Sequence, residues 1–348
     1  MENVIIIGSG PASWTAAIYA ARASLMPLLF EGAYTQQNQE FGTLPMGQLS
    51  LSNEVENFPG FPLGNIQPYL ESAVPNNRKD LLPPREDASQ GISGAELVEL
   101  MRTQAVYFGT RVVSDDIVDA DFTGAVHKLV GTNGHVYETK TVIVATGARA
   151  NYLGLPSETK FKNRGVSACA TCDGALPRFS NKPIAVIGGG DAAVEEAEYL
   201  TKTASKVYLI HRRHELRASK IVANRALHHP KIEIVWNRVP KEILGNDTDG
   251  VTGLLLESTV GEADIVLDVS GIFMAIGRTP NTGFLKDKIE LSPSGYVVRT
   301  VPFRTNTSVA GVFVAGDVAD DIYRQGIAAA GTGCMAAIDA ERYLVSCR

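Results

Sequence analysis

Two stretches of this sequence carry the same local pattern: an apolar run, then a glycine-rich turn, then residues with helical character. The first turn is GSGPAS, from Gly8 to Ser13, and the second is GGGDAA, from Gly188 to Ala193. A glycine pattern alone is a weak signal, but a strand before it and a helix after it are the context that marks a dinucleotide-binding unit. The sequence therefore predicts two such units in one chain.

Near-continuous apolar runs recur along the 348 residues, as expected for parallel strands that are buried on both faces. These runs, with the glycine that ends or follows each, occupy residues 4–8, 142–147, 184–190 and 312–317. Helices are expected to follow at Trp14–Ala23, Ala192–Lys202 and Thr332–Leu344. The predicted fold class is α/β, with two Rossmann-like nucleotide-binding domains.

The second domain is predicted to interrupt the first. The second glycine turn opens a unit that continues to about residue 279, after which GVFVAGD looks like a return to the first unit. We expect a split first domain at 1–149 and 280–348, with the second domain, 150–279, inserted between its parts. The chain is expected to cross between the domains near Ala148–Tyr152 and Gly277–Gly283.

Residues 65–90 differ from the rest of the first domain. They contain four prolines and mixed charge, and they show no clear hydrophobic period. This composition predicts an exposed loop insertion within the first domain. The simplest interpretation is a tolerated surface insertion, and the alternative is contact with a partner or a targeting role.

The residues that follow the second strand of each unit indicate which nucleotide binds there. Glu31 follows LLF in the first unit, and a carboxylate at that place accepts hydrogen bonds from ribose hydroxyls and repels a 2′-phosphate, which fits FAD. In the second unit the equivalent place holds Arg212, Arg213 and Arg217. Clustered guanidinium groups attract a 2′-phosphate, so NADPH is favoured over NADH, the alternative being an exposed basic turn. The split domain is therefore predicted to bind FAD and the inserted domain NADPH.

The inserted domain also contains CATCDG, in which two residues separate Cys169 from Cys172 and Asp173 follows directly. This spacing can place two sulfurs within disulfide reach at the start of a helix, where the pKa of a thiol is lowered. One sulfur would attack an external disulfide, the other would resolve the mixed disulfide, and Asp173 would supply a proton to the leaving thiolate. The alternatives are a pair of buried thiols and, for Asp173, a charge at a helix N-terminus.

Composition argues against several other functions. The net charge of −6 does not suit a general nucleic-acid binder. The four cysteines and six scattered histidines offer no zinc-ligand spacing, so no metal is expected. No apolar run reaches the roughly 18 residues of a membrane span. Because the chain also begins almost at once with a strand, we expect a soluble, cytoplasmic protein that does not bind a membrane.

Longer stretches of the sequence match one known family. They include GQL followed by EVENFPGFP, GVSACATCDGALP, IGGGDAAVEEAEYLTK, HRRHELRASK and GVFVAGDVADDIYRQGIAAAGTGCMAAIDAERYL. Over nearly its whole length the chain resembles the low-molecular-weight NADPH-dependent thioredoxin reductases. The resemblance implies a homodimeric flavoprotein in which electrons pass from NADPH through FAD to the Cys169–Cys172 disulfide and then to thioredoxin.

The resemblance also implies roles for individual residues. Cys172 would face the flavin, Cys169 would attack thioredoxin, and Asp173 would act as the acid and base. The residues that would bind FAD are Ser9, Gly10, Pro11, Ala12, Glu31, Gln48, Asn57, Ile117, Asp317, Arg324, Gln325 and Gly326. Those that would bind NADPH are Gly190, Asp191, Ala192, Arg212, Arg213 and Arg217. The inserted domain would rotate about the two crossings, so that nicotinamide and dithiol reach the flavin in turn.

The chain departs from the family pattern at a few places. Met46 replaces a glycine, Arg278 a histidine and Gly326 an alanine, and residues 65–90 are extra. Two alternative activities keep the same fold: a small-molecule dithiol oxidase and a ferredoxin-fed thioredoxin reductase. A flavin-binding regulatory protein without turnover is a third alternative. The arginine cluster favours the NADPH-dependent thioredoxin reductase.

Overall fold

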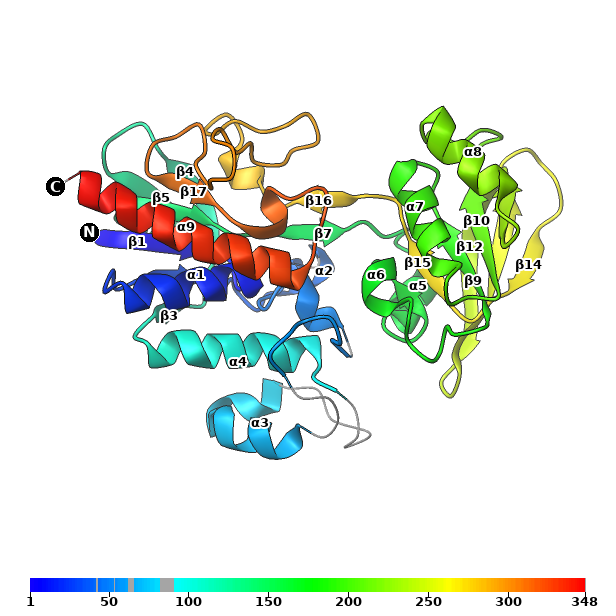
Figure 1. The fold of residues 1–348 in the computed structure, drawn as a ribbon, viewed down its shortest axis with the longest axis horizontal. Helices are drawn as coiled ribbons and strands as arrows, with labels where there is room; N and C mark the ends of the chain where they lie inside the picture. Colours follow the sequence, from blue (N-terminus) through cyan, green and yellow to red (C-terminus); the bar gives the residue numbers. More distant parts are fainter. Residues whose placement is uncertain (42, 53, 62–65, 82–90, 348) are drawn as a thin grey trace. The chain divides into compact units, whose positions relative to one another are not determined.

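The structure is a computed structural model that describes residues 1–41, 43–52, 54–61, 66–81 and 91–347. The chain forms two compact units (Figure 1). The first comprises Met1–Arg149 and Thr279–Arg348, and the second comprises Ala150–Arg278. The chain thus leaves the first unit after Arg149 and returns to it at Thr279, within the two segments where the sequence predicts crossings.

Within the described residues, the main sheet of the first unit has seven strands. They are β1 (Glu2–Ile7), β2 (Leu28–Phe30), β3 (Arg111–Val113), β4 (Ile117–Asp121), β5 (His127–Gly131), β6 (Val136–Val144) and β17 (Val312–Val314). Their order is β3-β2-β1-β6-β5-β4, and β17 pairs in parallel with the second half of β6. Ile5 at the parallel centre lies opposite Leu28 of β2 and Val142 of β6. The hairpin of β4 and β5 is antiparallel and continues onto β6.

Four helices of the described residues cover one face of this sheet: α1 (Pro11–Arg22), α3 (Gln67–Ala73), α4 (Gly94–Tyr107) and α9 (Gly326–Ser346). The unit also contains α2 (Gln36–Phe41) and the short 3₁₀ helices η1 (Gln48–Leu51), η2 (Asn76–Leu81), η3 (Gly283–Leu285) and η4 (Gly316–Val318). α1 packs against both α4 and α9, and α3 lies beside α4 (Figure 1). Val4 and Ile6 of β1 face this helical layer, whereas Ile5 and Ile7 face a second core on the opposite side of the sheet. Alternate residues of one strand are therefore buried on both faces, as a doubly covered parallel strand requires.

The expectation of an exposed loop at residues 65–90 is wrong for the part that the structure describes. Residues 67–73 form the helix α3, and η2 follows it. Ile66, Leu70 and Val74 are spaced by four residues and are all buried in the core that contains α4. This spacing is that of one helical face, and the four prolines around it obscured the pattern in the sequence. Residues 65 and 82–90 lie outside the described residues.

The second unit contains a parallel sheet of five strands in its described residues. They are β8 (Val166–Ser167), β9 (Pro183–Ile187), β10 (Lys206–His211), β11 (Ile232–Trp236) and β15 (Ile272–Met274), in the order β11-β10-β9-β15-β8. Its helices are α5 (Pro156–Phe161), α6 (Ala170–Asp173), α7 (Asp191–Leu200) and α8 (Lys220–His228). A separate antiparallel sheet, which the sequence did not predict, consists of β12 (Arg238–Asn246), β13 (Gly250–Ser258) and β14 (Ile265–Asp268).

The two crossing segments are themselves short strands. β7 (Ala148–Ala150) pairs with β16 (Arg278–Pro280) in a two-stranded sheet. Within the second unit, the Asn151 amide donates to the Gly277 carbonyl oxygen at 3.1 Å. The second unit therefore begins and ends at one place.

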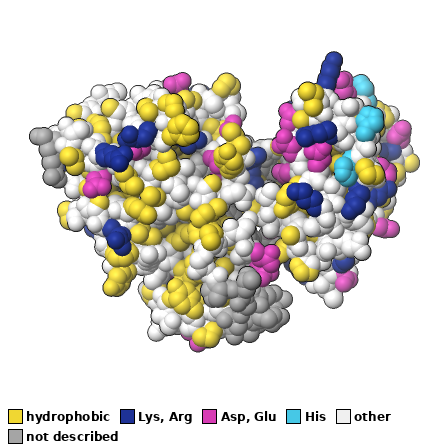
Figure 2. Space-filling view, viewed as in Figure 1, with side chains coloured by type: hydrophobic (Ala, Val, Ile, Leu, Met, Phe, Trp, Pro, Cys, Tyr) yellow, Lys and Arg dark blue, Asp and Glu magenta, His cyan; other side chains and the backbone are white. Residues whose placement is uncertain are grey.

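The two units differ in the side chains that they expose on the face drawn in Figure 2. Hydrophobic side chains are frequent on the first unit, whereas charged and histidine side chains are more prominent on the second. In the described parts of the chain, no helix is both long enough and apolar enough to cross a bilayer.

Candidate active site

The first glycine of each glycine-rich turn lies against the backbone of a residue that directly follows a neighbouring strand. A Cβ atom on Gly8, whose φ is +124°, would lie 2.2 Å from the carbonyl oxygen of Ala145. A Cβ atom on Gly188 would lie 2.5 Å from the carbonyl oxygen of Ala275. Both distances are too short for any side chain, so these turns require glycine.

The second glycine of each fingerprint faces open space instead. Cβ atoms built on Gly10 and Gly190 would have no heavy atom within 4 Å beyond their chain neighbours. Gly10 is the N-cap of α1 and Gly190 that of α7, and neither helix has a side-chain cap. An uncapped helix N-terminus beneath an open glycine binds phosphate through its N–H groups and its positive potential. Both units therefore fit a dinucleotide, and Pro11, Ala12, Asp191 and Ala192 begin the two helices.

Glu31 is buried directly after β2 and is held by two partners. Its Oε2 accepts a hydrogen bond from Arg102 Nε at 2.8 Å, and its Oε1 accepts one from Ser114 Oγ at 2.7 Å. Ser9 Oγ donates to the Glu31 carbonyl oxygen at 2.7 Å. A carboxylate has about four acceptor positions, so two bonds still leave room for ribose hydroxyls.

Ser9 also fixes a turn in which the chain departs from the family pattern. Its hydroxyl accepts the Met46 N–H at 2.8 Å. Met46 has a φ of +79°, a left-handed conformation for which glycine is the usual residue, and this explains why the family has glycine there. The Met46 side chain is buried in the core beside α1, and Gln48 follows at the start of η1.

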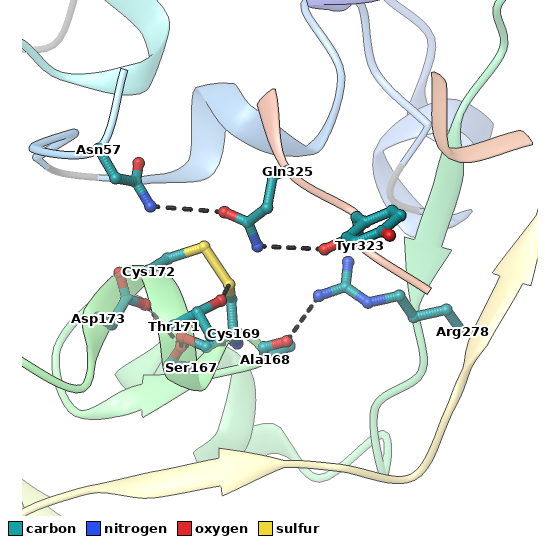
Figure 3. The surroundings of a disulfide bond; sticks show 10 residues. All are labelled: Asn57, Ser167, Ala168, Cys169, Thr171, Cys172, Asp173, Arg278, Tyr323 and Gln325. Atoms are coloured by element: carbon teal, nitrogen blue, oxygen red, sulfur yellow. Dashed lines mark hydrogen bonds between the residues drawn. A yellow bond between two sulfur atoms is a disulfide. The ribbon is translucent and has the colours of Figure 1, made fainter. Parts of the chain in front are cut away.

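The structure brings Asn57 and Gln325 together across a long stretch of sequence. Asn57 Nδ2 donates to Gln325 Oε1 at 3.4 Å, and Gln325 Nε2 donates to the Tyr323 carbonyl oxygen at 3.3 Å (Figure 3). Gln325 is the N-cap of α9, which begins at Gly326. Arg324 has a φ of +51°, and its N–H donates to Asp320 at 2.9 Å.

Two further predicted flavin residues belong to other elements of the first unit. Asp317 lies in η4, where the neighbouring Gly316 N–H donates to Thr332 Oγ1 of α9 at 2.9 Å. Ile117 is the first residue of β4 and is buried. The predicted flavin residues thus lie in or next to β2, β4, α1, η1, η4 and α9, except Asn57, which lies in a loop.

The arginine cluster of the second unit lies on a loop that folds back over the glycine turn. Arg212 and Arg213 directly follow β10, and the Arg217 N–H donates to the Gly189 carbonyl oxygen at 2.7 Å. The side chains of Arg212, Arg213 and Arg217 are all exposed. The Ser219 N–H donates to Asp191 Oδ1 at 2.8 Å and ties the end of this loop to α7. Three exposed arginines therefore lie on a loop that is anchored to the second glycine turn.

Cys169 and Cys172 form a disulfide, with an S–S distance of 2.07 Å and a Cα–Cα distance of 5.3 Å (Figure 3). Cys169 is the N-cap of the single turn α6, and both cysteines are half-buried. The Cys169 N–H donates to Ser167 Oγ at 3.0 Å. Arg278 Nη2 donates to the Ala168 carbonyl oxygen at 2.8 Å, so the residue that departs from the family pattern supports the segment leading to the disulfide.

Asp173 lies at the end of the same turn. Its Oδ2 accepts a hydrogen bond of 2.5 Å from the Ser167 hydroxyl (Figure 3). Burial raises the pKa of Asp173 above its usual range, and the hydrogen bond from Ser167 opposes that shift. A carboxyl group that keeps its proton to higher pH beside a disulfide suits general acid–base chemistry better than a purely structural charge.

Sequence reasoning missed three residues that hold this machinery in place: Ser167, Arg102 and Ser114. Ser167 is two residues before Cys169, but a serine there carries no pattern of its own. Arg102 and Ser114 are 71 and 83 residues from Glu31, so only the folded chain places them together. Among the residues that the structure describes, no cluster of three or more His, Cys, Asp or Glu is arranged to hold a metal ion.

The chain belongs to the pyridine nucleotide-disulphide oxidoreductase family, whose family model matches residues 2–333. Thioredoxin reductase 2 of Arabidopsis thaliana is 48% identical over 347 residues, which is 98% of this chain and 82% of that protein. The thioredoxin reductase of Yarrowia lipolytica is 44% identical over 344 residues, 98% of this chain and 97% of that one. The crystal structure of thioredoxin reductase from Streptococcus pyogenes superposes with a TM-score of 0.83 and 35% identity, covering 99% of both chains. Within the family, this chain falls among the thioredoxin reductases, as the sequence resemblance predicts.

Proposed function

We propose that this chain is an NADPH-dependent flavoprotein that reduces the disulfide of thioredoxin. The observation that carries the proposal is the combination of two open, uncapped glycine turns with a disulfide whose second cysteine directly precedes the half-buried Asp173. Two nucleotide sites allow one cofactor to deliver electrons to the other, and the disulfide provides an exit for them. The three exposed arginines favour NADPH as the donor over a ferredoxin-fed route or an oxidase.

The first unit would hold FAD. The α1 N-terminus, with Gly10, Pro11 and Ala12, would bind the pyrophosphate, and Glu31 would accept the ribose hydroxyls. Residues from the other elements of the first unit would hold the rest of the cofactor: Ser9, Gln48, Asn57, Ile117, Asp317, Arg324, Gln325 and Gly326. When bound, FAD supplies the means to accept a hydride from NADPH and to pass two electrons to a disulfide.

The second unit would hold NADPH. Gly190, Asp191 and Ala192 would place the pyrophosphate at the N-terminus of α7. The guanidinium groups of Arg212, Arg213 and Arg217 would pair with the 2′-phosphate. Because the loop that carries them is bonded to Gly189 and Asp191, the two phosphate sites would be joined by hydrogen bonds.

The dithiol chemistry follows from the two sulfurs. Reduction with two electrons and two protons opens the Cys169–Cys172 disulfide to two thiols. The Cys169 thiol loses its proton to solvent, and the resulting thiolate attacks one sulfur of the thioredoxin disulfide, so that a mixed disulfide forms and one thioredoxin thiolate leaves. Asp173 gives that thiolate a proton and then takes the proton of the Cys172 thiol. The Cys172 thiolate attacks the Cys169 sulfur and expels the second thioredoxin thiolate, which takes a proton from solvent, and the original disulfide is restored.

A coupled assay tests the proposal. Purified protein with NADPH, thioredoxin and the chromogenic disulfide DTNB should show thioredoxin-dependent release of the yellow thiolate. Failure with every thioredoxin tried, while NADPH still bleaches the flavin, would reject thioredoxin as the substrate. Protein that lacks flavin absorbance, or that keeps it under anaerobic NADPH, would reject the whole electron path.

We also propose a homodimer and a cytoplasmic location. Exposed Tyr19, Ile327 and Val345 on α1 and α9 support a further interface, and hydrophobic side chains are frequent on the viewed face of this unit (Figure 2). Light scattering should give twice the chain mass. Cys334 and Cys347 are free thiols, which suits a reducing compartment. Because one relative is named thioredoxin reductase 1, mitochondrial, cell fractionation is the deciding measurement for location.

Asp173→Asn should slow thioredoxin reduction about a hundredfold and remove one limb of its pH profile. Burial keeps the Asp173 proton to a higher pH than an ordinary aspartate, so proton donation should decline as the pH rises through this raised pKa. An asparagine donates no proton and shows no such decline. The measurement is kcat/KM for thioredoxin as a function of pH.

Ser167→Ala is the matched control for Asp173→Asn. Its hydroxyl lowers the pKa of Asp173, so removal of the hydroxyl should move the falling limb to higher pH rather than abolish it. Identical pH profiles for the unaltered protein and Asp173→Asn would show that another group supplies the proton.

A further inference from the structure

The segment 66–81 is joined to α4 by an ion pair as well as by its apolar face. Arg78 Nε and Nη2 each donate to one carboxylate oxygen of Glu99, both at 2.9 Å. The Glu99 side chain is 0% exposed and that of Arg78 is 15% exposed. A bidentate pair with so little solvent is strong and specific, because the buried carboxylate has no water to replace its partner.

A second ion pair lies beside the first on α4. Arg102 Nε donates to Glu31 Oε2 at 2.8 Å, and the Arg102 guanidinium lies 5.8 Å from the centre of the Trp14 ring. The two pairs lie close enough together that all four of their charges affect the pKa of one side chain, the phenol of Tyr34. The pKa of Tyr34 is raised, first by burial and then by Glu31, with a smaller contribution from Glu99, while Arg78 and Arg102 oppose the shift. Two cations and two anions therefore form one balanced cluster.

The spacing of the two pairs on α4 permits an exchange of partners. Glu99 and Arg102 are three residues apart on α4, so their side chains are neighbours on one face of the helix. Without Arg78, the buried Glu99 carboxylate has Arg102 as its nearest cation on the same helix. If Arg102 turned to Glu99, the Glu31 carboxylate would lose one of its two side-chain donors among the described residues, and Ser114 would be the one left.

We propose that Arg78 is a positioning residue for the FAD site. By neutralising Glu99 it keeps Arg102 on Glu31, and it thereby keeps the Glu31 carboxylate oriented to accept ribose hydroxyls. This inference rests on the proposed role of Glu31 in holding FAD. It gives the extra segment a function, because an element that the family pattern lacks supports the adenosine end of the cofactor site.

The test measures how tightly FAD binds to three variants. Arg78→Gln removes the charge but leaves an amide that can still donate to Glu99, so it is less disruptive than Arg78→Ala. Lys79→Gln removes the neighbouring charge, which donates to the Glu71 carbonyl oxygen, and serves as the control. Arg78→Gln with Glu99→Gln removes both charges of the outer pair and with them the competitor for Arg102. For each protein, the FAD dissociation constant and the melting temperature with and without FAD are measured.

Arg78→Gln should weaken FAD binding by about tenfold or more, which is the loss expected for one hydrogen bond to a charged group. It should also shrink the rise in melting temperature that FAD produces. The double variant should recover the original FAD affinity, and Lys79→Gln should not differ from the unaltered protein.

Other outcomes would overturn the inference. If Arg78→Gln lowered the melting temperature of the apoprotein but left the FAD dissociation constant unchanged, Arg78 would be a structural residue only. If the double variant bound FAD as weakly as Arg78→Gln, partner exchange would be excluded. An unaltered protein that bound no FAD would remove the proposed function together with this inference, whereas equal binding by the unaltered protein and Arg78→Gln would remove the inference alone.

Discussion

Cys172→Ser should abolish the NADPH-dependent reduction of thioredoxin, with a fall in rate of at least about a thousandfold. A serine hydroxyl cannot form a disulfide, so the chain would lose the only disulfide seen in its described residues. The nucleotide sites are built from other residues and should be unaffected. The flavin content, and its bleaching by NADPH under anaerobic conditions, should therefore match those of the unaltered protein.

The chain offers a matched control for this substitution. Cys334 is a half-buried free thiol in α9, and Cys334→Ser should leave thioredoxin reduction unchanged. The DTNB assay with thioredoxin compares the two variants directly. Substantial thioredoxin reduction by Cys172→Ser would mean that electrons leave the protein by a different group, and the proposed dithiol chemistry would have to be abandoned.

Arg213→Ala should raise the KM for NADPH by about ten- to a hundredfold and should leave the KM for NADH nearly unchanged. The guanidinium group would lose a charge-assisted bond to the 2′-phosphate, which NADH does not have. The loop itself should keep its shape, because its link to the glycine turn is made by backbone atoms of Arg217 and Gly189.

The control for Arg213→Ala is His214→Ala, an exposed neighbour in the same loop. It should change neither constant. Initial rates with NADPH and NADH, at several salt concentrations, provide the measurement. If Arg213→Ala changed the KM for NADPH and the KM for NADH equally, pairing with the 2′-phosphate would be refuted. The three arginines would then be residues of an exposed turn without a role in nucleotide binding.

The sequence predicted the parts of the site that depend on neighbouring residues. The glycine turns, Glu31 after its strand, the arginine cluster and the cysteine pair are all local patterns, and their chemistry follows from spacing. In the structure, Gly10 and Gly190 are the N-caps of their helices, and the arginine loop is bonded to the second turn. The binding roles of these residues stay predictions.

The contacts that orient those groups were not predictable in the same way. Arg102 reaches Glu31, and Arg78 reaches Glu99, through folding that no short window of sequence contains. The helix α3 was hidden by prolines, although three apolar residues four apart lay within it and at its ends. Met46 adopts a left-handed conformation that the residue type does not suggest. Tertiary packing, rather than local preference, decided each of these features.

The entry and exit of the second unit at one place have a practical consequence. Because Asn151 and Gly277 are hydrogen-bonded neighbours, a polypeptide of residues 150–278 would have its two termini side by side. Such a fragment is a natural candidate for expression as a stand-alone module. Joining residues 149 and 279 with a few linker residues would give the complementary protein. The affinity for the pyridine coenzyme could then be measured on the fragment and the affinity for the flavin on the complementary protein.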